Sequence, residues 1–187
     1  FKDDGADTLL NLGTVTTLTF TGGADNDVLQ NNGMVLGTLN FGGDAGADLL
    51  VNTGTVTTLS FTGGADNDIL QNAGTIVKSL TFGGDAGADI LLNTGSVTSL
   101  GFTGGADNDI LQNTGMIITS LTFGGDGGAD LLTNSGSITT LTFTGGADND
   151  VLVNSSGGTV TTLTFGGDAN STDPFADAGA DTLVNLG

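Results

Sequence analysis

The sequence predicts an all-β protein that folds as a parallel β-solenoid, similar in architecture to a β-helix or β-roll, with eight to nine coils of 20–22 residues. Three observations predict this fold: a repeat that runs along the chain, short apolar runs of alternating polarity in each repeat, and glycine-rich turns between the runs. A single repeat of this length cannot bury its own apolar face, so the repeats have to stack into one continuous core.

Phenylalanine marks the repeat most clearly. The phenylalanines are separated by 21, 20, 21, 20, 21, 20 and 22 residues: Phe20, Phe41, Phe61, Phe82, Phe102, Phe123, Phe143 and Phe165. Two kinds of repeat alternate, Phe-Thr-Gly-Gly-Ala-Asp-Asn-Asp from Phe20 and Phe-Gly-Gly-Asp-Ala-Gly-Ala-Asp from Phe41. In both kinds an Asn follows the last Asp by four residues. The first three repeats that begin with Phe-Thr-Gly-Gly are one residue longer, and the additional residue lies between the next Gly and the next Phe, as from Gly33 to Phe41.

The two ends of the chain carry the same pattern. We expect residues 1–187 to form one repetitive solenoid, with a loop inserted at residues 170–178. Phe175–Gly187 closely repeats Phe1–Gly13, so the chain begins and ends at the same phase of the repeat. We interpret the chain as one unit of a longer array or as a filament subunit that stacks head to tail, because the open end of a solenoid is a strand edge with unpaired backbone groups.

Each repeat contains the segment Asp-x-Leu-x-Asn, which we expect to form a short strand with its Leu and Asn on the inner face. The Asn residues form one column: Asn11, Asn31, Asn52, Asn72, Asn93, Asn113, Asn134, Asn154 and Asn185. A buried Asn can bond the coils above and below it through its amide, which avoids burying an unpaired polar group. A second run places Leu59 and Phe61 inward, and two polar residues between Val56 and Leu59 predict a bend.

Composition excludes several classes of function. The chain has no His, Cys, Trp, Tyr or Arg, and it sets Lys2 and Lys78 against 21 Asp, which gives a formal net charge of -19. Without His or Cys it lacks the usual zinc ligands, a thiol nucleophile and a Ser-His triad, so we do not expect an enzyme. Two cations cannot hold nucleic acid phosphates, and no apolar run approaches the roughly 18 residues of a membrane span. We expect neither nucleic acid binding nor membrane insertion.

The Asp residues lie in or beside one turn of the coil, between the inward Phe and the inward Leu. Stacked about 5 Å apart, neighbouring carboxylates repel by roughly 1 kcal/mol in water and several times more near protein. The sum exceeds a typical folding free energy of about 5–15 kcal/mol, so the fold needs a counter-ion. Hard oxygen ligands at glycine-rich turns suit Ca²⁺ better than Mg²⁺, which demands stricter geometry. We predict several calcium ions in a row along this corner, with these ligands: Asp7, Asp25, Asp27, Asp44, Asp48, Asp66, Asp68, Asp85, Asp89, Asp107, Asp109, Asp126, Asp130, Asp148, Asp150, Asp168 and Asp181.

A plainer interpretation of the acidic corner is that the Asp residues only form solvated turns, because Asp and Gly both favour turns. Asn or Ser would serve such a turn without adding charge, and Glu never occurs in the chain. The calcium interpretation therefore explains more of the pattern.

The segment Gly22–Gln30, Gly-Gly-Ala-Asp-Asn-Asp-Val-Leu-Gln, resembles the calcium-binding nonapeptide of RTX (hemolysin-type) proteins, Gly-Gly-x-Gly-x-Asp-x-apolar-x. The same nine positions recur from Gly63, Gly104 and Gly145, with Asp25 and its equivalents in place of the third Gly. The other kind of repeat, read from its first Gly, has one more residue before its last Asp and resembles the nonapeptide less closely. RTX coils bind calcium at both edges, whereas this chain has one such turn per coil.

The resemblance implies a set of calcium ligands and a cellular location. It implies that one Asp side chain per turn ligates calcium, with backbone carbonyls of the glycine-rich turn completing the shell: Asp27, Asp68, Asp109 and Asp150. It also implies secretion into a calcium-rich medium, so we expect an extracellular or cell-surface protein.

The residues on the outer face of the Asp-x-Leu-x-Asn strands predict a contact surface. The position before each inward Leu is apolar in consecutive repeats: Val28, Leu49, Ile69, Ile90, Ile110, Leu131 and Val151. Exposed apolar strips often mark contact surfaces, so we expect lateral self-association through these residues, in addition to or instead of head-to-tail stacking. The alternative is that they reflect only the β-propensity of an exposed strand.

A column of Thr and Ser on the other outward face raises the alternative of ice binding: Thr17, Thr38, Thr58, Ser79, Ser99, Ser120, Thr140 and Thr162. A second column is interrupted by Asn40 and Gly101, which argues against a regular ice-matching array. Carbohydrate binding lacks Tyr or Trp side chains for stacking against a sugar. We therefore expect a calcium-stabilised extracellular structural protein, forming a fibre or the repetitive stalk of a bacterial surface adhesin or S-layer protein, with an ice- or carbohydrate-binding module as the alternative.

Overall fold

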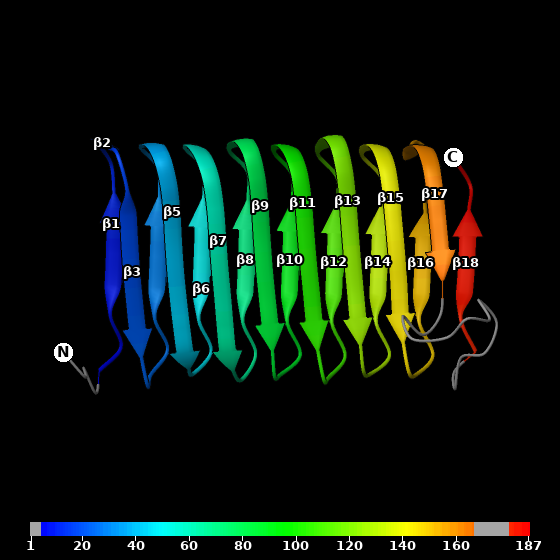
Figure 1. Ribbon diagram of the computed structural model, residues 1–187, viewed down its shortest axis with the longest axis horizontal. Coiled ribbons are helices and arrows are strands. Elements are labelled where there is room, and N and C mark those ends of the chain that lie inside the picture. The colour runs from blue at the N-terminus through cyan, green and yellow to red at the C-terminus, as the bar shows by residue number, and fades with distance from the viewer. Residues whose placement is uncertain (1–4, 167–179) are drawn as a thin grey trace.

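The computed structural model describes residues 5–166 and 180–187, and it confirms an all-β parallel solenoid (Figure 1). Each coil between Val28 and Gly166 contributes one short strand and one long strand, and in the coil before Val28 the long strand is divided into two pieces. The coils stack along the long axis of the molecule. The predicted insertion at 170–178 lies outside the described residues. Within the described part, no helix is long and apolar enough to cross a membrane.

In the part of the chain that the structure describes, the strands form two parallel sheets of nine strands each. The short-strand sheet contains β1 (Thr8–Asn11), β4 (Val28–Asn31), β6 (Leu49–Asn52), β8 (Ile69–Asn72), β10 (Ile90–Asn93), β12 (Ile110–Asn113), β14 (Leu131–Asn134), β16 (Val151–Asn154) and β18 (Thr182–Asn185). The long-strand sheet contains β2 (Thr14–Val15), β3 (Leu18–Gly23), β5 (Met34–Ala45), β7 (Thr55–Ala65), β9 (Thr75–Asp85), β11 (Ser96–Gly105), β13 (Met116–Asp126), β15 (Ser137–Gly146) and β17 (Thr159–Gly166).

The core lies between the two sheets and consists of ladders of identical or similar residues. Leu59 and Phe61 are buried as predicted, and they pair in register with Leu80 and Phe82 of the next coil. Ring centroids of successive phenylalanines lie 4.8–5.4 Å apart from Phe20 to Phe165. Each coil therefore covers the apolar face of its neighbours, as the repeat length requires.

The predicted Asn ladder is present at the ends of the short strands. The Nδ2 group of Asn72 donates to Oδ1 of Asn93 at 2.8 Å, and Asn93 donates in the same way to Asn113. The same bond links each Asn from Asn11 to Asn185 with the next one, at 2.7–2.8 Å. Side-chain amides thus replace, inside the turn, the hydrogen bonds that water would supply.

The long strands are irregular where the sequence predicts a bend. The pairing of β7 with β9 shifts register between Val56 and Thr58, near the start of both strands. The long strands curve along this edge of the solenoid, which lies at the top in Figure 1. The longer repeats place two residues opposite one at this point, so that Leu36 of β5 points outward and is 55% exposed. The additional residue of the longer repeat is therefore accommodated as a bulge that leaves the core unchanged.

Candidate metal site at the acidic turns

The last Asp of each acidic turn points into the molecule, between the end of a long strand and the start of a short strand. These side chains are 0–1% exposed and form what we call the inner Asp row: Asp27, Asp48, Asp68, Asp89, Asp109, Asp130 and Asp150. Asp7 and Asp181, both half-buried, extend the row at its two ends through the same hydrogen bonds. The stacking of the coils has therefore placed carboxylates from distant parts of the sequence in one buried line.

One oxygen of each inner carboxylate is satisfied by the neighbouring coil. Oδ1 of Asp89 accepts a hydrogen bond from the backbone N–H of Asp68 at 2.7 Å, and Oδ1 of Asp109 accepts from Asp89 in the same way. The bond recurs along the row at 2.6–2.9 Å. Each inner carboxylate therefore joins two coils through its Oδ1 atom.

The second oxygen, Oδ2, is enclosed without a hydrogen-bond partner in six inner carboxylates of the described part: Asp27, Asp48, Asp68, Asp89, Asp109 and Asp130. It lies against a glycine of its own turn, so that a Cβ at Gly84 would overlap Oδ2 of Asp89. A buried carboxylate oxygen normally has a donor or a cation beside it. These oxygens are therefore the atoms in the structure that most require a positive partner.

Burial makes charge unfavourable on five carboxylates of the inner row. It raises the pKa of Asp48 and Asp109 to about 6 and the pKa of Asp68, Asp89 and Asp130 to about 7. The backbone N–H from the preceding Asp lowers each of these pKa values, and nearby carboxylates raise them further. At neutral pH a cation or a proton beside Oδ2 would relieve this unfavourable charge.

The donor chemistry of the inner row fits calcium, which prefers carboxylate and carbonyl oxygens in flexible arrangements. Within residues 5–166 and 180–187, no three acidic side chains are grouped so that they could hold a metal ion. A calcium ion at this row would therefore combine an Oδ2 atom with backbone carbonyl oxygens and water, rather than with several carboxylates.

The other predicted ligands lie apart from the inner row. A second, outer Asp row follows the surface of the same corner: Asp25, Asp44, Asp66, Asp85, Asp107, Asp126 and Asp148. Asp25 is half-buried and the remainder are exposed, while Asp44, Asp66, Asp85 and Asp126 adopt positive φ angles of 75–78°. Asp168 lies outside the described residues. The predicted ligands thus separate into buried and exposed groups, a division that the sequence analysis did not make.

Two kinds of turn alternate and interlock through the outer side chains. We call them Asp-Asn-Asp turns, such as residues 66–68, and Gly-Ala-Asp turns, such as residues 46–48. The backbone N–H of Gly46 donates to Oδ2 of Asp66 in the following coil at 3.2 Å, and that of Ala47 donates to Oδ1 of Asn26 in the preceding coil at 2.9 Å. The next Gly-Ala-Asp turns, at 87–89 and 128–130, repeat both bonds.

The interlocking explains a feature that the sequence analysis left unassigned. Asn26, Asn67 and Asn108 were not among the predicted site residues, although Asn alternates with Ala at the position before the inner Asp. The two turns also have equal length, because Gly23 pairs with Asp44 in the sheet. The glycine that contacts the buried carboxylate is therefore the second Gly of the longer-looking motif, Gly43, and the two kinds of turn align without an insertion.

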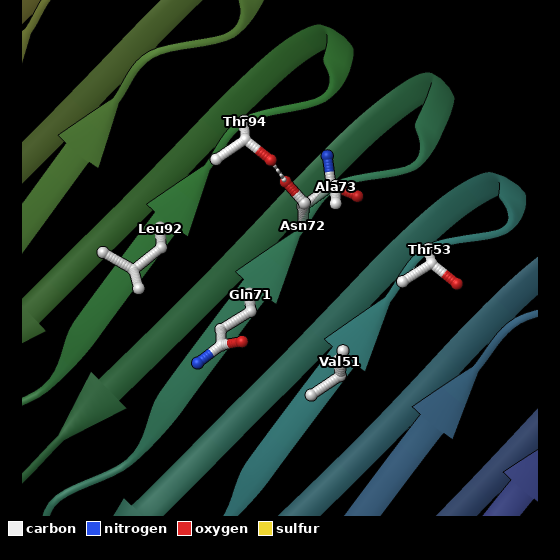
Figure 2. Close-up of a pocket in the computed structure, with 7 residues that line it drawn as sticks. All are labelled: Val51, Thr53, Gln71, Asn72, Ala73, Leu92 and Thr94. Carbon is white, nitrogen blue, oxygen red and sulfur yellow. Dashed lines mark hydrogen bonds between the residues drawn. The ribbon is translucent and has the colours of Figure 1, made fainter.

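The outward faces of the two sheets are uncharged over most of the solenoid. On the short-strand sheet, Val51, Gln71 and Leu92 lie side by side on consecutive strands and line a shallow hollow with Thr53 and Thr94 (Figure 2). The predicted apolar strip lies on this face, and its residues are half-buried except for Ile110, which is 37% exposed.

On the long-strand sheet, the Thr and Ser column predicted from the sequence is in register from coil to coil. Thr58 pairs with Ser79, and Ser99 pairs with Ser120. The column of Thr62 and Gly83, four residues further along each strand, alternates Thr with Gly. Small, neutral side chains therefore stand in register over this part of the long-strand sheet.

Comparison with known proteins bears on the fold. No family model and no curated protein matches the sequence. A solved structure that it resembles is the X-ray crystal structure of a hyperactive, Ca²⁺-dependent, β-helical antifreeze protein from an Antarctic bacterium, at 21% sequence identity and a TM-score of 0.59. The match covers 96% of this chain and 58% of that chain, so the chain spans little more than half the length of the protein it resembles. The likeness shows that the chain has a β-helical solenoid fold.

Proposed function

We propose that the chain is a calcium-stabilised structural solenoid, which serves as an extracellular fibre or as the repetitive stalk of a bacterial surface adhesin or S-layer protein. The observation that carries the proposal is the row of buried Oδ2 atoms without a hydrogen-bond partner, such as those of Asp68 and Asp89. The Ca²⁺ dependence of the antifreeze protein of similar fold supports the choice of ion.

Calcium would supply positive charge at the inner Asp row. The inner carboxylates would hold it through Oδ2, together with carbonyl oxygens of the glycine-rich turns. The chain's own residues prepare this position: the N–H bonds to Oδ1 orient each carboxylate, and the glycines leave room beside Oδ2. Removing the ion would leave a line of buried like charges, which opposes the folded state.

A structural role agrees with the way the molecule is built. The inner Asn ladder, the phenylalanine stack and the inner Asp row all run along the solenoid without a break in the central coils. The chain contains no His, Cys, Tyr or Arg with which to perform acid–base or nucleophilic chemistry at neutral pH. An elongated, calcium-dependent scaffold would account for the Asn ladder, the phenylalanine stack and the inner Asp row. The millimolar calcium of an extracellular medium would be sufficient to fill such sites.

The test is a calcium titration of the chelated chain, followed by circular dichroism and light scattering on the same sample. We expect a weak β signal without calcium and its recovery as calcium is added. Potassium chloride at matched ionic strength is the control for simple screening of charge, and it should restore much less signal. A β signal that survives chelation unchanged would show that calcium does not stabilise this fold. Scattering that rises with the β signal would favour a filament, and constant scattering would favour a stalk segment.

Ice binding is the second candidate. The in-register Thr and Ser column of the long-strand sheet favours it, as does the antifreeze protein of similar fold. The test is thermal hysteresis of the calcium-loaded chain, with Thr58→Tyr and Thr140→Tyr as variants that disturb the column. Thr133→Tyr, on the outer face of the opposite sheet, is the matched control. Absence of hysteresis in the unsubstituted chain would exclude this function.

A further inference from the structure

The two kinds of acidic turn differ at the glycine beside the inner carboxylate. At Gly43, in a Gly-Ala-Asp turn, a Cβ would overlap both Oδ2 of Asp48 in the same coil and the carbonyl oxygen of Gly63 in the next coil. The same pair of oxygens meets at the next two Gly-Ala-Asp turns, where Gly84 faces Asp89 and Gly104, and Gly125 faces Asp130 and Gly145. Two oxygens from consecutive coils therefore converge beside each of these glycines.

The Asp-Asn-Asp turns lack this convergence. At Gly22, Gly63 and Gly104, the three atoms nearest to the position of a Cβ all belong to the Asp side chain of the same turn, and the farthest of them lies at 2.9–3.0 Å. The carbonyl oxygen of the next coil is therefore farther from these glycines than it is at the Gly-Ala-Asp turns, where it is nearer than the Asp Cγ atom at 2.8 Å. The two oxygens are thus gathered less closely at the Asp-Asn-Asp turns.

The hydrogen bonds of the outer residues divide the junctions between coils in the same way. Between a Gly-Ala-Asp turn and the coil that follows it, the side chain at the junction is a carboxylate, since Gly46 donates to Asp66. Between an Asp-Asn-Asp turn and the coil that follows it, the side chain is a neutral amide, since Ala47 donates to Asn26. The hydrogen-bonded outer carboxylate and the converging oxygens thus occur at the same alternate junctions.

We propose that calcium binds first at the junction between each Gly-Ala-Asp turn and the following Asp-Asn-Asp turn, which gives one tightly bound ion for every two coils. This inference rests on the proposed calcium-stabilised function. Calcium affinity increases with the number and charge of the oxygen ligands that a site presents before binding. The tight sites contain Oδ2 of Asp48, Asp89 and Asp130, and the remaining junctions fill at higher calcium concentration.

The test compares two matched triple variants of the full chain. One carries Asp48→Asn, Asp89→Asn and Asp130→Asn, and the other carries Asp27→Asn, Asp68→Asn and Asp109→Asn. Asn has the shape of Asp and keeps an Oδ1 acceptor for the N–H of the preceding coil, so each substitution removes the charge and Oδ2 while preserving the hydrogen bond between coils. The chelated proteins are titrated with calcium by calorimetry, and circular dichroism is recorded on the same samples.

The unsubstituted chain should bind calcium in two steps of different affinity, separated by about tenfold or more. The first triple variant should lose three ions from the tight step, while the second should keep the tight step and lose ions from the weak step. Equal losses in the two variants, or loss of the tight step in the second, would overturn the inference and leave the calcium-stabilised function intact. Failure of the unsubstituted chain to bind calcium would instead reject that function.

Single substitutions in adjacent central coils keep the test decisive if a triple variant does not fold. Asp89→Asn should remove one tightly bound ion, and Asp68→Asn should remove none. Luminescence of Tb³⁺ bound in place of calcium provides an independent count of ions on the same two variants. The inference fails if the two single variants bind the same number of ions in the tight step.

Discussion

Single residues set the properties of the acidic corner, and glycine matters there as much as aspartate. Gly84 brings the backbone of β9 against Oδ2 of Asp89, and the carbonyl oxygen of Gly104 lies at the same place. At Gly83, its neighbour in the chain, a Cβ would have open space around it, with no atom within 4 Å. The two adjacent glycines thus have different roles, although the sequence presents them as one Gly-Gly pair.

Substitution of these two glycines separates the roles. Gly84→Ala should destabilise the protein by about 1–3 kcal/mol or more, because the added methyl group overlaps buried oxygens that have no room to move. Gly83→Ala is the matched control and should change stability by less than about 1 kcal/mol. Thermal unfolding in saturating calcium measures both effects. Equal destabilisation by the two variants would show that the space beside Asp89 is not restrictive.

The raised pKa values of the inner carboxylates predict the pH dependence of the calcium-free chain. A carboxyl with a folded-state pKa of about 7, as for Asp68, Asp89 and Asp130, binds its proton more tightly in the folded state than in the unfolded state, where the value is 3.8. This contribution to stability is fully present below pH 3.8 and is lost as the pH rises through 7. The melting temperature without calcium should therefore fall between about pH 4 and pH 7.

The control for this pH dependence is a variant with Asp68→Asn, Asp89→Asn and Asp130→Asn, whose melting temperature should vary less over the same range. Added calcium should also reduce the dependence, because the ion replaces the protons. A calcium-free chain that becomes more stable as the pH rises from 4 to 7 would contradict the raised pKa values of Asp68, Asp89 and Asp130.

At the scale of structural elements, the ends of the short strands depend on the Asn ladder. Asn93 accepts from Asn72 and donates to Asn113, both inside the turn and away from water. Each Asn from Asn31 to Asn154 is therefore part of two ladder hydrogen bonds, which connect three coils. The ladder adds side-chain links between the coils to the backbone pairing of the strands.

Asn93→Ala should lower the free energy of unfolding by roughly 2–4 kcal/mol, because buried groups on both neighbouring Asn residues lose their partners. Gln112→Ala, on the exposed face of β12, is the control and should change stability by less than about 0.5 kcal/mol. Chemical denaturation in calcium measures the difference. A small effect of Asn93→Ala would indicate that water enters the turn and replaces the amide.

The elements of the fold were largely predictable from the sequence, because the same alternation of inward and outward residues recurs in every repeat. The period of 20–22 residues predicted the coil, the alternation around Leu59 and Phe61 predicted which residues are buried, and the two polar residues after Val56 predicted the irregularity. These features follow from side-chain direction in a strand, which the chain encodes locally.

The detail of the metal site was less predictable. The sequence identified the acidic corner, but it did not divide the Asp residues into a buried and an exposed row. That division depends on the backbone conformation of residues such as Asp44, whose φ angle of 78° is one that glycine usually adopts. The residue paired with Asp44 in the following coil is indeed a glycine, Gly64. The division also depends on which atom of the next coil lies opposite each carboxylate, as the carbonyl oxygen of Gly63 does beside Asp48. Such contacts join residues about 20 positions apart and have no local signal.

At the scale of the whole molecule, charge and apolar surface are kept apart. The inner and outer Asp rows follow the edge of the solenoid at which the long strands end, which lies at the bottom in Figure 1. The exposed Leu36 lies near the start of β5, and the long strands start at the opposite edge. The strip from Val28 to Val151 runs along the outer face of the short-strand sheet between these edges. Two copies could therefore meet through this strip without bringing their acidic edges into contact.

Lateral association through the strip is testable with charge substitutions. Ile69→Lys together with Ile110→Lys should reduce any association of the calcium-loaded chain, because the substitutions place charge in the middle of an apolar contact. Thr81→Lys together with Thr122→Lys, in the long strands of the same coils, is the control. Sedimentation velocity over a range of concentrations measures the effect. Equal changes in the two pairs would indicate a general effect of charge and not a contact through the strip.

The interlocking of the turns also restricts how such a chain can gain or lose repeats during evolution. The Asp-Asn-Asp turns at residues 66–68, 107–109 and 148–150 each supply an Asp acceptor to the coil before them and an Asn acceptor to the coil after them. Deletion or duplication of one coil would bring two Gly-Ala-Asp turns together, with backbone N–H groups that have no side-chain acceptor, or two Asp-Asn-Asp turns, with additional carboxylates side by side. Genes for solenoids of this design should therefore change length in steps of two coils, which in this chain is the 41 residues from Phe20 to Phe61.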